Sequence, residues 1–515
     1  MIASEAFLRD LWERLETGEV QEKEQLQRVK TELVRRHHLR GLPGDAEILA
    51  HAPGVLPEGL ADLLRVKPTR SASGVVVVSV MTAPHPCPHG VCIYCPGGPR
   101  FGTPQSYTGT EPAARRAAQH RFDPQEQATA RVAQIRTMGH PTDKIDLIIL
   151  GGTFSSLDPA YKESFVKGCF DGLNGIVASD LEGAHRINET AAARCVGLTI
   201  ETKPDCLTDR EARELLRYGT TRVELGIQTT HDDVLGVVNR GHTDADSRLA
   251  TRRVKDAGLK LCYHMMPGLP GNDVDRDLES FRAIFEDPAY RPDMLKIYPT
   301  LVLEGTGLHT MWTHDRYTPL TLEDSIELVA KVKAIVPPWV RIQRIQREIN
   351  ADMIEGGPTR GDLRVRAQHR LATWGLRCKC IRCREIGLRP VPLRSDEIRL
   401  HRMDYEASGG LELFLSYEDD SQETLVGYAR LRICNIGAFL RELKVFGRVV
   451  PISALPGSRW QHRGYGARLL AECERIAAEE HGRHELFVTS GVGVREYYRR
   501  FGYAQSGPYM AKALE

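Results

Sequence analysis

Three cysteines in one short loop are the side chains best suited to metal and redox chemistry. Cys87, Cys92 and Cys95 lie in a segment rich in Pro and Gly, directly after the apolar run 74–81. A 4Fe-4S cube held by three thiolates keeps open positions on its fourth iron. Glycine tolerates unusual backbone dihedral angles, so such a loop can wrap around a cluster. The spacing indicates an iron–sulfur site after a buried strand, with a zinc knuckle or three unrelated thiols as alternatives.

A second group of thiols lies in a basic segment farther along the chain. Cys378, Cys380 and Cys383 fall within six residues. Thiolates so close repel one another unless a cation holds them, so we interpret the group as a zinc site with His369 or His401 as fourth ligand. Unliganded or reactive thiols are the alternative. Because the group lies between two expected domains, we predict a structural clamp.

The C-terminal part has a pattern typical of phosphate binding. Residues 461–467, Gln-His-Arg-Gly-Tyr-Gly-Ala, open an expected helix over 464–480. A glycine loop before a helix presents free N–H groups and the positive end of the helix dipole, which suits a pyrophosphate. A strand and an aromatic helix follow, an order similar to the acetyl-coenzyme A site of GCN5-related acetyltransferases (GNAT). Tyr497 and Tyr498 offer a phenol for the thioester, although adjacent helical tyrosines are as often one core and one surface residue.

Composition restricts the class of protein. A chain of 515 residues has room for about three domains. Its twelve cysteines are clustered, and its first residues mix charged and apolar side chains, so we expect no secretory leader and a reducing cytoplasmic location. No apolar stretch approaches the roughly 20 residues of a membrane span, so we expect no membrane partner. The 69 basic and 68 acidic side chains nearly cancel.

Positive charge is concentrated in two segments. Residues 341–384 contain eleven Lys or Arg and four acidic residues, and residues 23–40 are also basic. Such segments suit the phosphates of a nucleic acid. Solvated helix faces are the alternative.

Strand-length apolar segments alternate with helical segments through the middle of the chain. The expected strands are 75–80, 145–150, 196–200, 223–227, 260–265 and 295–298, and the expected helices are 124–138, 209–218, 245–257 and 275–285. This alternation predicts a parallel sheet curved into all or part of a barrel. Chemistry in such sheets gathers at the carboxyl ends of the strands, where the cysteine loop and Gly151-Gly152-Thr153 lie. Two amphipathic helices are expected in residues 5–40, and an α+β domain from about residue 399.

Many short motifs occur in one order along nearly the whole chain. They are Val66-Lys-Pro-Thr-Arg, the cysteine loop, Gln105-Ser-Tyr-Thr-Gly, Leu150-Gly-Gly-Thr-Phe, Ile200-Glu-Thr-Lys-Pro-Asp, Val223-Glu-Leu-Gly-Ile-Gln, Asn239-Arg-Gly-His-Thr, His264-Met-Met-Pro, Leu295-Lys-Ile-Tyr-Pro and Ser490-Gly-Val-Gly-Val-Arg. In these motifs the chain resembles the Elongator catalytic subunit family in its archaeal and bacterial form. The resemblance implies an α/β fold: a partial (β/α)6 radical S-adenosylmethionine barrel, an α+β GNAT-like acetyltransferase domain and a small helical N-terminal module.

The resemblance also implies a division of the chain and a reaction. The expected parts are a basic tRNA-binding module (1–70), the radical barrel (71–336), a basic linker with the zinc cysteines (337–395) and an acetyl-coenzyme A-binding domain (396–515). The implied reaction is carboxymethylation of the wobble uridine of tRNA at ring carbon 5. Reductive cleavage of S-adenosylmethionine at the open iron would give a radical that takes hydrogen from the methyl group of acetyl-coenzyme A, and the resulting carbon radical would add to the base.

Cofactors and partners follow from the same resemblance. They are the 4Fe-4S cluster, S-adenosylmethionine, acetyl-coenzyme A, zinc, an electron donor and the anticodon arm of tRNA, with homo-oligomerisation left open. A protein lysine acetyltransferase with a structural cluster is the second reading, and a tRNA-binding scaffold with degenerate sites is the third.

The resemblance assigns roles to individual residues. Cys87, Cys92 and Cys95 would hold the cluster, and Gly151, Gly152, Thr153 and Gln228 would line the S-adenosylmethionine site. The expected acetyl-coenzyme A contacts are Lys144, Glu442, Leu443, Lys444, Val445, Gln461, Gly464, Tyr465, Gly466, Ala467 and Tyr498, with Tyr498 also assigned to catalysis. Lys144 poses a conflict, because a strand of about six residues, roughly 20 Å, separates it from the Gly151-Gly152 turn.

Four residues depart from the family pattern. Lys444 and Phe446 stand where most members have His and Tyr, Lys203 stands where Arg is common, and Gly268 stands where many members have Asp. Lys444 can still pair with a phosphate as a point charge.

Overall fold

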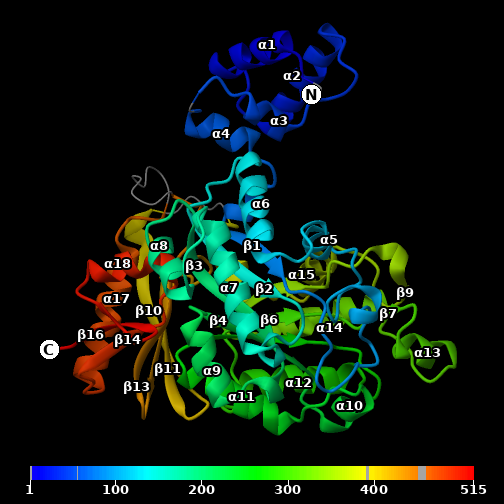
Figure 1. Cartoon of the computed structure of the whole chain (residues 1–515), viewed down its shortest axis with the longest axis vertical. Coiled ribbons are helices and arrows are strands. Elements are labelled where there is room, and N and C mark those ends of the chain that lie inside the picture. The colour runs from blue at the N-terminus through cyan, green and yellow to red at the C-terminus, as the bar shows by residue number, and fades with distance from the viewer. Residues whose placement is uncertain (1–2, 55, 390–393, 451–459) are drawn as a thin grey trace.

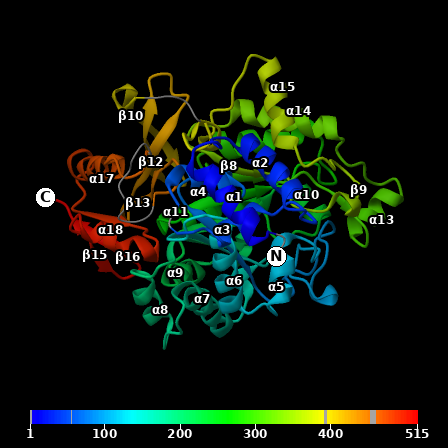
Figure 2. The ribbon, with the colours of Figure 1, turned by 90° about the horizontal axis from the view of Figure 1, so that it is seen from above.

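The structure is a computed structural model that describes residues 3–54, 56–389, 394–450 and 460–515. It has three parts: a small helical module at one end, a central sheet surrounded by helices, and a second sheet at the side (Figure 1). Seen from above, the helical module lies over the middle of the central part (Figure 2). None of the described helices is long and apolar enough to cross a membrane.

Four helices form the N-terminal module: α1 (Glu5–Glu16), α2 (Lys23–Arg36), α3 (Asp45–Ala50) and α4 (Glu58–Leu64). Apolar residues at helical spacing, among them Leu11 and Leu33, form its core, which confirms the two amphipathic helices expected there. The module is joined to the central part through Arg65, whose Nε donates to the Gly139 carbonyl at 2.9 Å.

Seven parallel strands form the central sheet in the order β1-β2-β3-β4-β5-β6-β8. They are β1 (Val76–Met81), β2 (Lys144–Leu150), β3 (Arg194–Thr202), β4 (Arg222–Gln228), β5 (Lys260–Met265), β6 (Met294–Ile297) and β8 (Arg341–Ile345). All six expected strands are present. Strand β8 was not expected, because its sequence, Arg-Ile-Gln-Arg-Ile, has too many polar residues to be recognised as a buried strand. It lies in the segment that the sequence analysis assigned to the linker.

Helices pack around this sheet, and the four expected ones are α6, α9, α11 and α12. The full set is α5 (Pro112–Gln119), α6 (Pro124–Thr137), α7 (Pro159–Asn174), α8 (Leu181–Asn188), α9 (Asp209–Arg217), α10 (Asp232–Val237), α11 (Asp244–Asp256), α12 (Val274–Glu286), α13 (Gly307–Thr313), α14 (Leu322–Ile335), α15 (Leu363–Thr373) and α16 (Ile381–Arg384). A two-stranded antiparallel pair, β7 (Val302–Leu303) with β9 (Ile354–Gly356), lies beside them.

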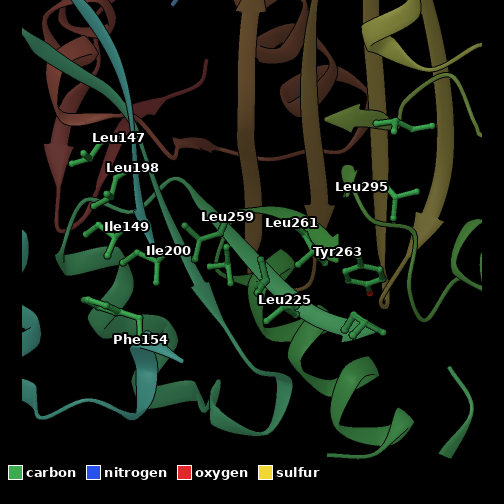
Figure 3. Close-up of a cluster of buried hydrophobic side chains, with 14 of the residues drawn as sticks. Leu147, Ile149, Phe154, Leu198, Ile200, Leu225, Leu259, Leu261, Tyr263 and Leu295 are labelled. Atoms are coloured by element: carbon green, nitrogen blue, oxygen red, sulfur yellow. The ribbon is translucent and has the colours of Figure 1, made fainter. Parts of the chain in front are cut away.

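The two faces of the central sheet differ in chemistry. Figure 3 shows part of its apolar cluster, to which Leu147, Ile200 and Leu225 from three neighbouring strands contribute. Side chains alternate between the faces of a strand, so Glu201 and Glu224, which neighbour two of these residues in sequence, point to the opposite face. The inner face of the curved sheet is therefore polar.

The second sheet has the order β10-β11-β12-β13-β14-β16-β15. Its elements are β10 (Ile398–Ala407), β11 (Gly410–Asp419), β12 (Leu425–Cys434), β13 (Gly437–Val445), β14 (Glu485–Val488), β15 (Ala504–Ser506), β16 (Tyr509–Ala513), α17 (Tyr465–Arg475) and α18 (Arg495–Arg499). This confirms the expected α+β domain, in which a π-helical turn over Ile476–Glu480 extends α17. Among the described strands, β14 pairs with β13 only over Ala438–Leu440. Residues 441–445 therefore leave a backbone edge open on that side.

A buried network of charges joins the two sheets. Arg441 on β13 donates to both carboxylate oxygens of Asp293, just before β6, at 2.7 and 2.8 Å. Arg441 also donates to Glu412 on β11 at 2.7 Å. The other members are Lys255, Arg430, Arg432 and Glu442. Buried ions are costly unless they are paired, so this network restricts how the two sheets can pack against each other.

We expect Asp293→Asn to lower the free energy of unfolding by about 3–5 kcal/mol, because it leaves Arg441 buried without its main counter-charge. Urea unfolding followed by circular dichroism measures the change. Glu182→Gln is the control, since the Glu182–Arg186 pair is exposed to solvent and should leave stability unchanged within error. Equal unfolding midpoints for the two variants would contradict the proposed importance of the network.

Candidate functional site

The cysteines of the first loop lie at the carboxyl edge of the central sheet. Cys87 Sγ lies 3.5 Å from Thr153 Oγ1, and Cys95 Sγ accepts a hydrogen bond from the Gln105 side-chain amide at 3.2 Å. Cys92 and Cys95 are buried, and Cys87 is half-buried. Burial raises the pKa of the Cys87 and Cys95 thiols. Their thiolate forms therefore need a bound cation.

The separation of the sulfurs distinguishes a cluster from a single ion. Zinc holds each thiolate at about 2.3 Å, so its ligand atoms lie close together. Among the described residues, Cys378-Cys380-Cys383 and Glu224-Cys262-His264 are the groups whose ligand atoms all lie within 4.8 Å of one another, and the first cysteine loop is not among them. The sulfurs of Cys87, Cys92 and Cys95 are thus not all within 4.8 Å of one another, a separation that fits a ligand with several metal atoms better than a single ion. The donors therefore fit a 4Fe-4S cluster better than a zinc knuckle.

The residues expected around S-adenosylmethionine lie at the same edge. Gly151 and Gln228 have φ values of 139° and 73°. A side chain at Gly151 would meet Thr82 Oγ1 at 1.9 Å, so close packing against the end of β1 already requires glycine there. The side-chain oxygen of Gln228 is buried and has no hydrogen-bond partner within the described part of the chain. Such an orphaned acceptor fits a ligand that donates hydrogen bonds.

A histidine and two cations surround Cys92. His89 Nε2 lies 3.2 Å from Cys92 Sγ, and His89 Nδ1 lies 2.9 Å from Lys203 Nζ. Burial together with the positive charges of Lys203 and Arg240 lowers the pKa of His89 to about 4. The imidazole is therefore neutral near pH 7.

The inner face of the sheet carries a buried polar network that the sequence analysis missed. Glu224 accepts a hydrogen bond from His264 Nε2 at 2.7 Å and pairs with Lys296. Lys296 lies 3.5 Å from Glu201, which accepts a hydrogen bond from Tyr107 at 3.3 Å. Burial opposes charge on Glu224, but Lys296 and His264 lower its pKa well below the ordinary value. The sequence signal that could have indicated this network is an ionisable residue between two apolar neighbours in β4, β5 and β6, namely Glu224, His264 and Lys296.

The second thiol group meets the distance requirement for one metal ion. The sulfurs of Cys378, Cys380 and Cys383 lie within 4.8 Å of one another. Neither His369 nor His401 belongs to this group, so the structure does not bring the expected fourth ligand to it. The number of residues between these histidines and the cysteines does not indicate which side chain the fold brings near the three sulfurs. The group lies between the two sheets, since Ile381 N–H donates to Val340 and Ile386 N–H donates to Leu425.

Lys144 and the glycine loop before α17 meet at the amino edge of the central sheet. Lys144 is the first residue of β2, so the strand does not start later and Lys144 lies at the edge opposite the Gly151-Gly152 turn. Its Nζ donates to the Val450 carbonyl at 2.6 Å and to Gln461 Oε1 at 3.3 Å. The second sheet therefore reaches the edge opposite the cysteine loop. Gly464 is the N-cap of α17 with a φ of 83°, as a glycine loop entering a helix requires.

The remaining residues expected at acetyl-coenzyme A lie along this region. Glu442, Leu443, Lys444 and Val445 form the β13 edge that β14 leaves open. Tyr465, Gly466 and Ala467 form the first turn of α17. Burial and the nearby Arg341 lower the pKa of Lys444.

The two tyrosines of α18 differ in environment. Tyr498 is buried in the core of the second sheet, and burial strongly raises the pKa of its phenol. Tyr497 is less buried, with a pKa of about 12, and its hydroxyl lies where a side chain on Gly466 would come within 2.9 Å. Tyr497 is therefore the phenol that faces the glycine loop.

The basic segments are only partly on the surface. Arg341 and Arg384 are buried and paired with Glu385 and Glu418. The exposed basic residues are Lys23, Arg28, Arg35, Arg36 and Arg40 in the first segment and Arg344, Arg360, Arg377 and Lys379 in the second.

Comparisons with known proteins give the family. Four family models match: ELP3 N-terminal domain at residues 4–72, Radical SAM superfamily at 85–284, Radical_SAM C-terminal domain at 292–373 and Acetyltransferase (GNAT) domain at 401–513. A Methanocaldococcus jannaschii protein named tRNA uridine(34) acetyltransferase is 47% identical over 97% of this chain and 95% of its own length. The chain belongs to the Elongator complex protein 3 family.

Other members of the Elongator complex protein 3 family are similarly close. The Schizosaccharomyces pombe protein is 44% identical over 95% of this chain and 94% of its own length. The solved structure of archaeal Methanocaldococcus infernus Elp3, with an N-terminal deletion, is 41% identical, with a TM-score of 0.76, and covers 86% of this chain and 100% of that one. These matches confirm the predicted family and the predicted fold of a radical SAM barrel with a GNAT domain. Radical SAM membership implies a 4Fe-4S cluster and S-adenosylmethionine.

We predict that the two thiol groups bind different metals, so that one metal can be lost without the other. We expect Cys380→Ser to lose a metal other than iron and to keep the iron of the cluster, because it removes one of only three close sulfurs. Mass spectrometry of metals in the purified protein measures both contents. Cys473→Ser, a buried thiol in the core of the second sheet, is the control and should change neither. Wild-type protein that contains only iron would contradict a metal other than iron at the second group.

Proposed function

We propose that this protein modifies the wobble uridine of tRNA. The Methanocaldococcus jannaschii relative is named tRNA uridine(34) acetyltransferase, and this name supports uridine 34 of tRNA as the substrate. The observation that carries the proposal is the joining of two sites on one sheet. A thiol loop suited to a cluster lies at its carboxyl edge, and Lys144 contacts the glycine loop of the GNAT domain at its amino edge.

The proposed product is uridine carrying a carboxymethyl group on ring carbon 5. The cluster and S-adenosylmethionine supply a carbon radical able to abstract hydrogen when both are bound. Acetyl-coenzyme A supplies the two carbons, and water releases coenzyme A from the thioester. Addition at C5 would leave a radical on the base, which would lose the C5 hydrogen as a proton and give up one electron. This electron balances the one that the external donor supplies for the cleavage of S-adenosylmethionine.

The proposed roles of this chain's residues are binding, orientation and exclusion of water. Cys87, Cys92 and Cys95 hold the cluster. Gln228, with its orphaned side-chain oxygen, accepts a hydrogen bond from S-adenosylmethionine beside Gly151-Gly152-Thr153. The open β13 edge and the first turn of α17 bind acetyl-coenzyme A, with Tyr498 assigned to the thioester and Tyr497 as the alternative phenol.

Exposed basic residues of both positive segments are proposed to contact the phosphates of the anticodon arm. The uridine has to leave its stack to reach the sheet edge, as bases do in other enzymes that react on them. Zinc is the proposed metal at Cys378-Cys380-Cys383, and an external donor supplies the electron. The division into 1–70, 71–336, 337–395 and 396–515 belongs to this proposal, with β8 moved from the third part to the barrel.

The reaction is tested by anaerobic reconstitution with iron and sulfide, followed by incubation with tRNA, S-adenosylmethionine, dithionite and acetyl-coenzyme A. Mass spectrometry of the nucleosides is expected to detect carboxymethyluridine with wild type and none with Cys92→Ser, because one iron loses its ligand. An acetylated nucleoside would instead indicate simple acetyl transfer. Unmodified tRNA from an iron-loaded enzyme would contradict the proposal.

Lys144 gives a second test at the other edge. We expect Lys144→Met to raise the Kd for coenzyme A about tenfold or more, because it removes a charged donor from the glycine loop. Isothermal titration calorimetry measures the affinity without any need for the cluster. Lys167→Met, a half-buried lysine of α7 that pairs with Asp171 and not with the glycine loop, is the control. Equal Kd values for the two variants would place coenzyme A elsewhere.

A further inference from the structure

Cys92 differs from the other two cysteines of its loop in the groups that reach its sulfur. Cys87 has the Thr153 hydroxyl as its neighbour, and Cys95 has the Gln105 amide. Cys92 has the His89 imidazole at 3.2 Å and Arg240 Nη1 at 3.8 Å. An imidazole and a guanidinium therefore both reach this one sulfur.

The proton on His89 is assigned by its second neighbour. Lys203 Nζ lies 2.9 Å from His89 Nδ1, and a protonated lysine can only donate. Nδ1 must then accept, so the imidazole proton sits on Nε2 and points at Cys92 Sγ. Lys203 thus donates to His89, and His89 donates to Cys92, so the two hydrogen bonds form a chain that runs in one direction.

The chain is held in place by its surroundings. Lys203 follows β3, is only 2% exposed and has Asp205 as its other partner at 3.2 Å. Gly241, with a φ of 72°, packs directly against the His89 side chain, and a side chain there would meet His89 Cβ at 2.5 Å. The His89 side chain therefore occupies the space that a side chain at position 241 would need.

We propose that Lys203 and His89 are positioning residues that deliver a hydrogen bond and a positive charge to the Cys92 thiolate and so raise the reduction potential of the cluster. The proposal rests on the proposed function, because it requires the cluster at this loop. Hydrogen bonds to cluster sulfurs and nearby charge both set the potential. The reduced cluster carries one more negative charge, and in a buried site that charge is poorly screened, so a donor and a cation stabilise it. An electron from an external donor is then accepted more readily.

A lysine at position 203 fits this role. An arginine there would also carry a positive charge and would only donate hydrogen bonds, as a protonated lysine does. Either residue therefore gives His89 the same tautomer.

The test is a spectroelectrochemical titration of the anaerobically reconstituted full chain, with iron and sulfide content measured on each sample. We expect His89→Phe and Lys203→Met to keep wild-type iron while the ratio of reduced to oxidised cluster at a fixed solution potential falls about tenfold, equivalent to about 59 mV for one electron. Lys203→Arg is the matched control and should retain the wild-type ratio. The effect of the double variant should be smaller than the product of the two single effects, because the two residues are coupled in one chain.

A second readout covers the case in which a variant binds less iron. The shift of the iron–sulfur stretching bands between H2O and D2O, measured by resonance Raman spectroscopy, should be smaller in His89→Phe than in wild type, because the exchangeable proton on Nε2 is lost while those of Gln105 and Arg240 remain. His89→Gln, which keeps an amide donor, should retain the wild-type shift. Unchanged potentials in iron-loaded His89→Phe and Lys203→Met would overturn the inference and leave the proposed function intact. Wild type that takes up no iron and sulfide would overturn both.

Discussion

The contact between Arg441 and Asp293 is the constraint on which the arrangement of this molecule depends. Both side chains are fully buried, and the guanidinium makes two hydrogen bonds to the carboxylate. Asp293 also accepts the Leu261 N–H of β5 at 2.8 Å, so one carboxylate binds both sheets. A planar bidentate pair allows little variation in the angle between the guanidinium and the carboxylate. A buried charge that loses its partner strongly destabilises the fold, so both side chains are needed. The GNAT domain is therefore held at one edge of the barrel in one orientation.

That orientation explains the position of the two candidate sites. The network lies at the amino edge of the central sheet, so the glycine loop before α17 comes next to Lys144. The cysteine loop lies at the other edge, about 20 Å away at the usual rise of a strand. Between them the inner face carries Glu224, Lys296 and Glu201 in contact with one another. The two sites are thus separated by a polar surface of fixed charges and not by an apolar core.

The cysteine loop is itself supported by neighbouring strands. Residues after β2, β3 and β4 each contact one of its cysteines or His89: Thr153, Lys203 and Arg240. A loop rich in Pro and Gly has little structure of its own, so these contacts determine where its sulfurs point. The metal-binding chemistry comes from the loop, and its geometry comes from the barrel.

The sequence alone determined the features that depend on local pattern. Six apolar segments of strand length predicted six of the barrel strands, and the close spacing of Cys378, Cys380 and Cys383 predicted a metal-binding group, because neighbours in sequence stay close in any fold. The glycine loop at 461–467 predicted the start of α17 for the same reason. Strand β8 was missed, since its polar residues are stabilised by partners such as Glu385 that local pattern does not identify.

Only the tertiary structure decided which distant residues meet. Neither histidine named for the second thiol group joins it, the phenol of Tyr497 and not that of Tyr498 faces the glycine loop, and Lys144 lies beside Gln461, which is more than 300 residues away in sequence. Such contacts depend on chain crossings and on the packing of one sheet against another. The buried charges that fix this packing are spread over β11, β12, β13 and the start of β6, so no short stretch of sequence contains the information.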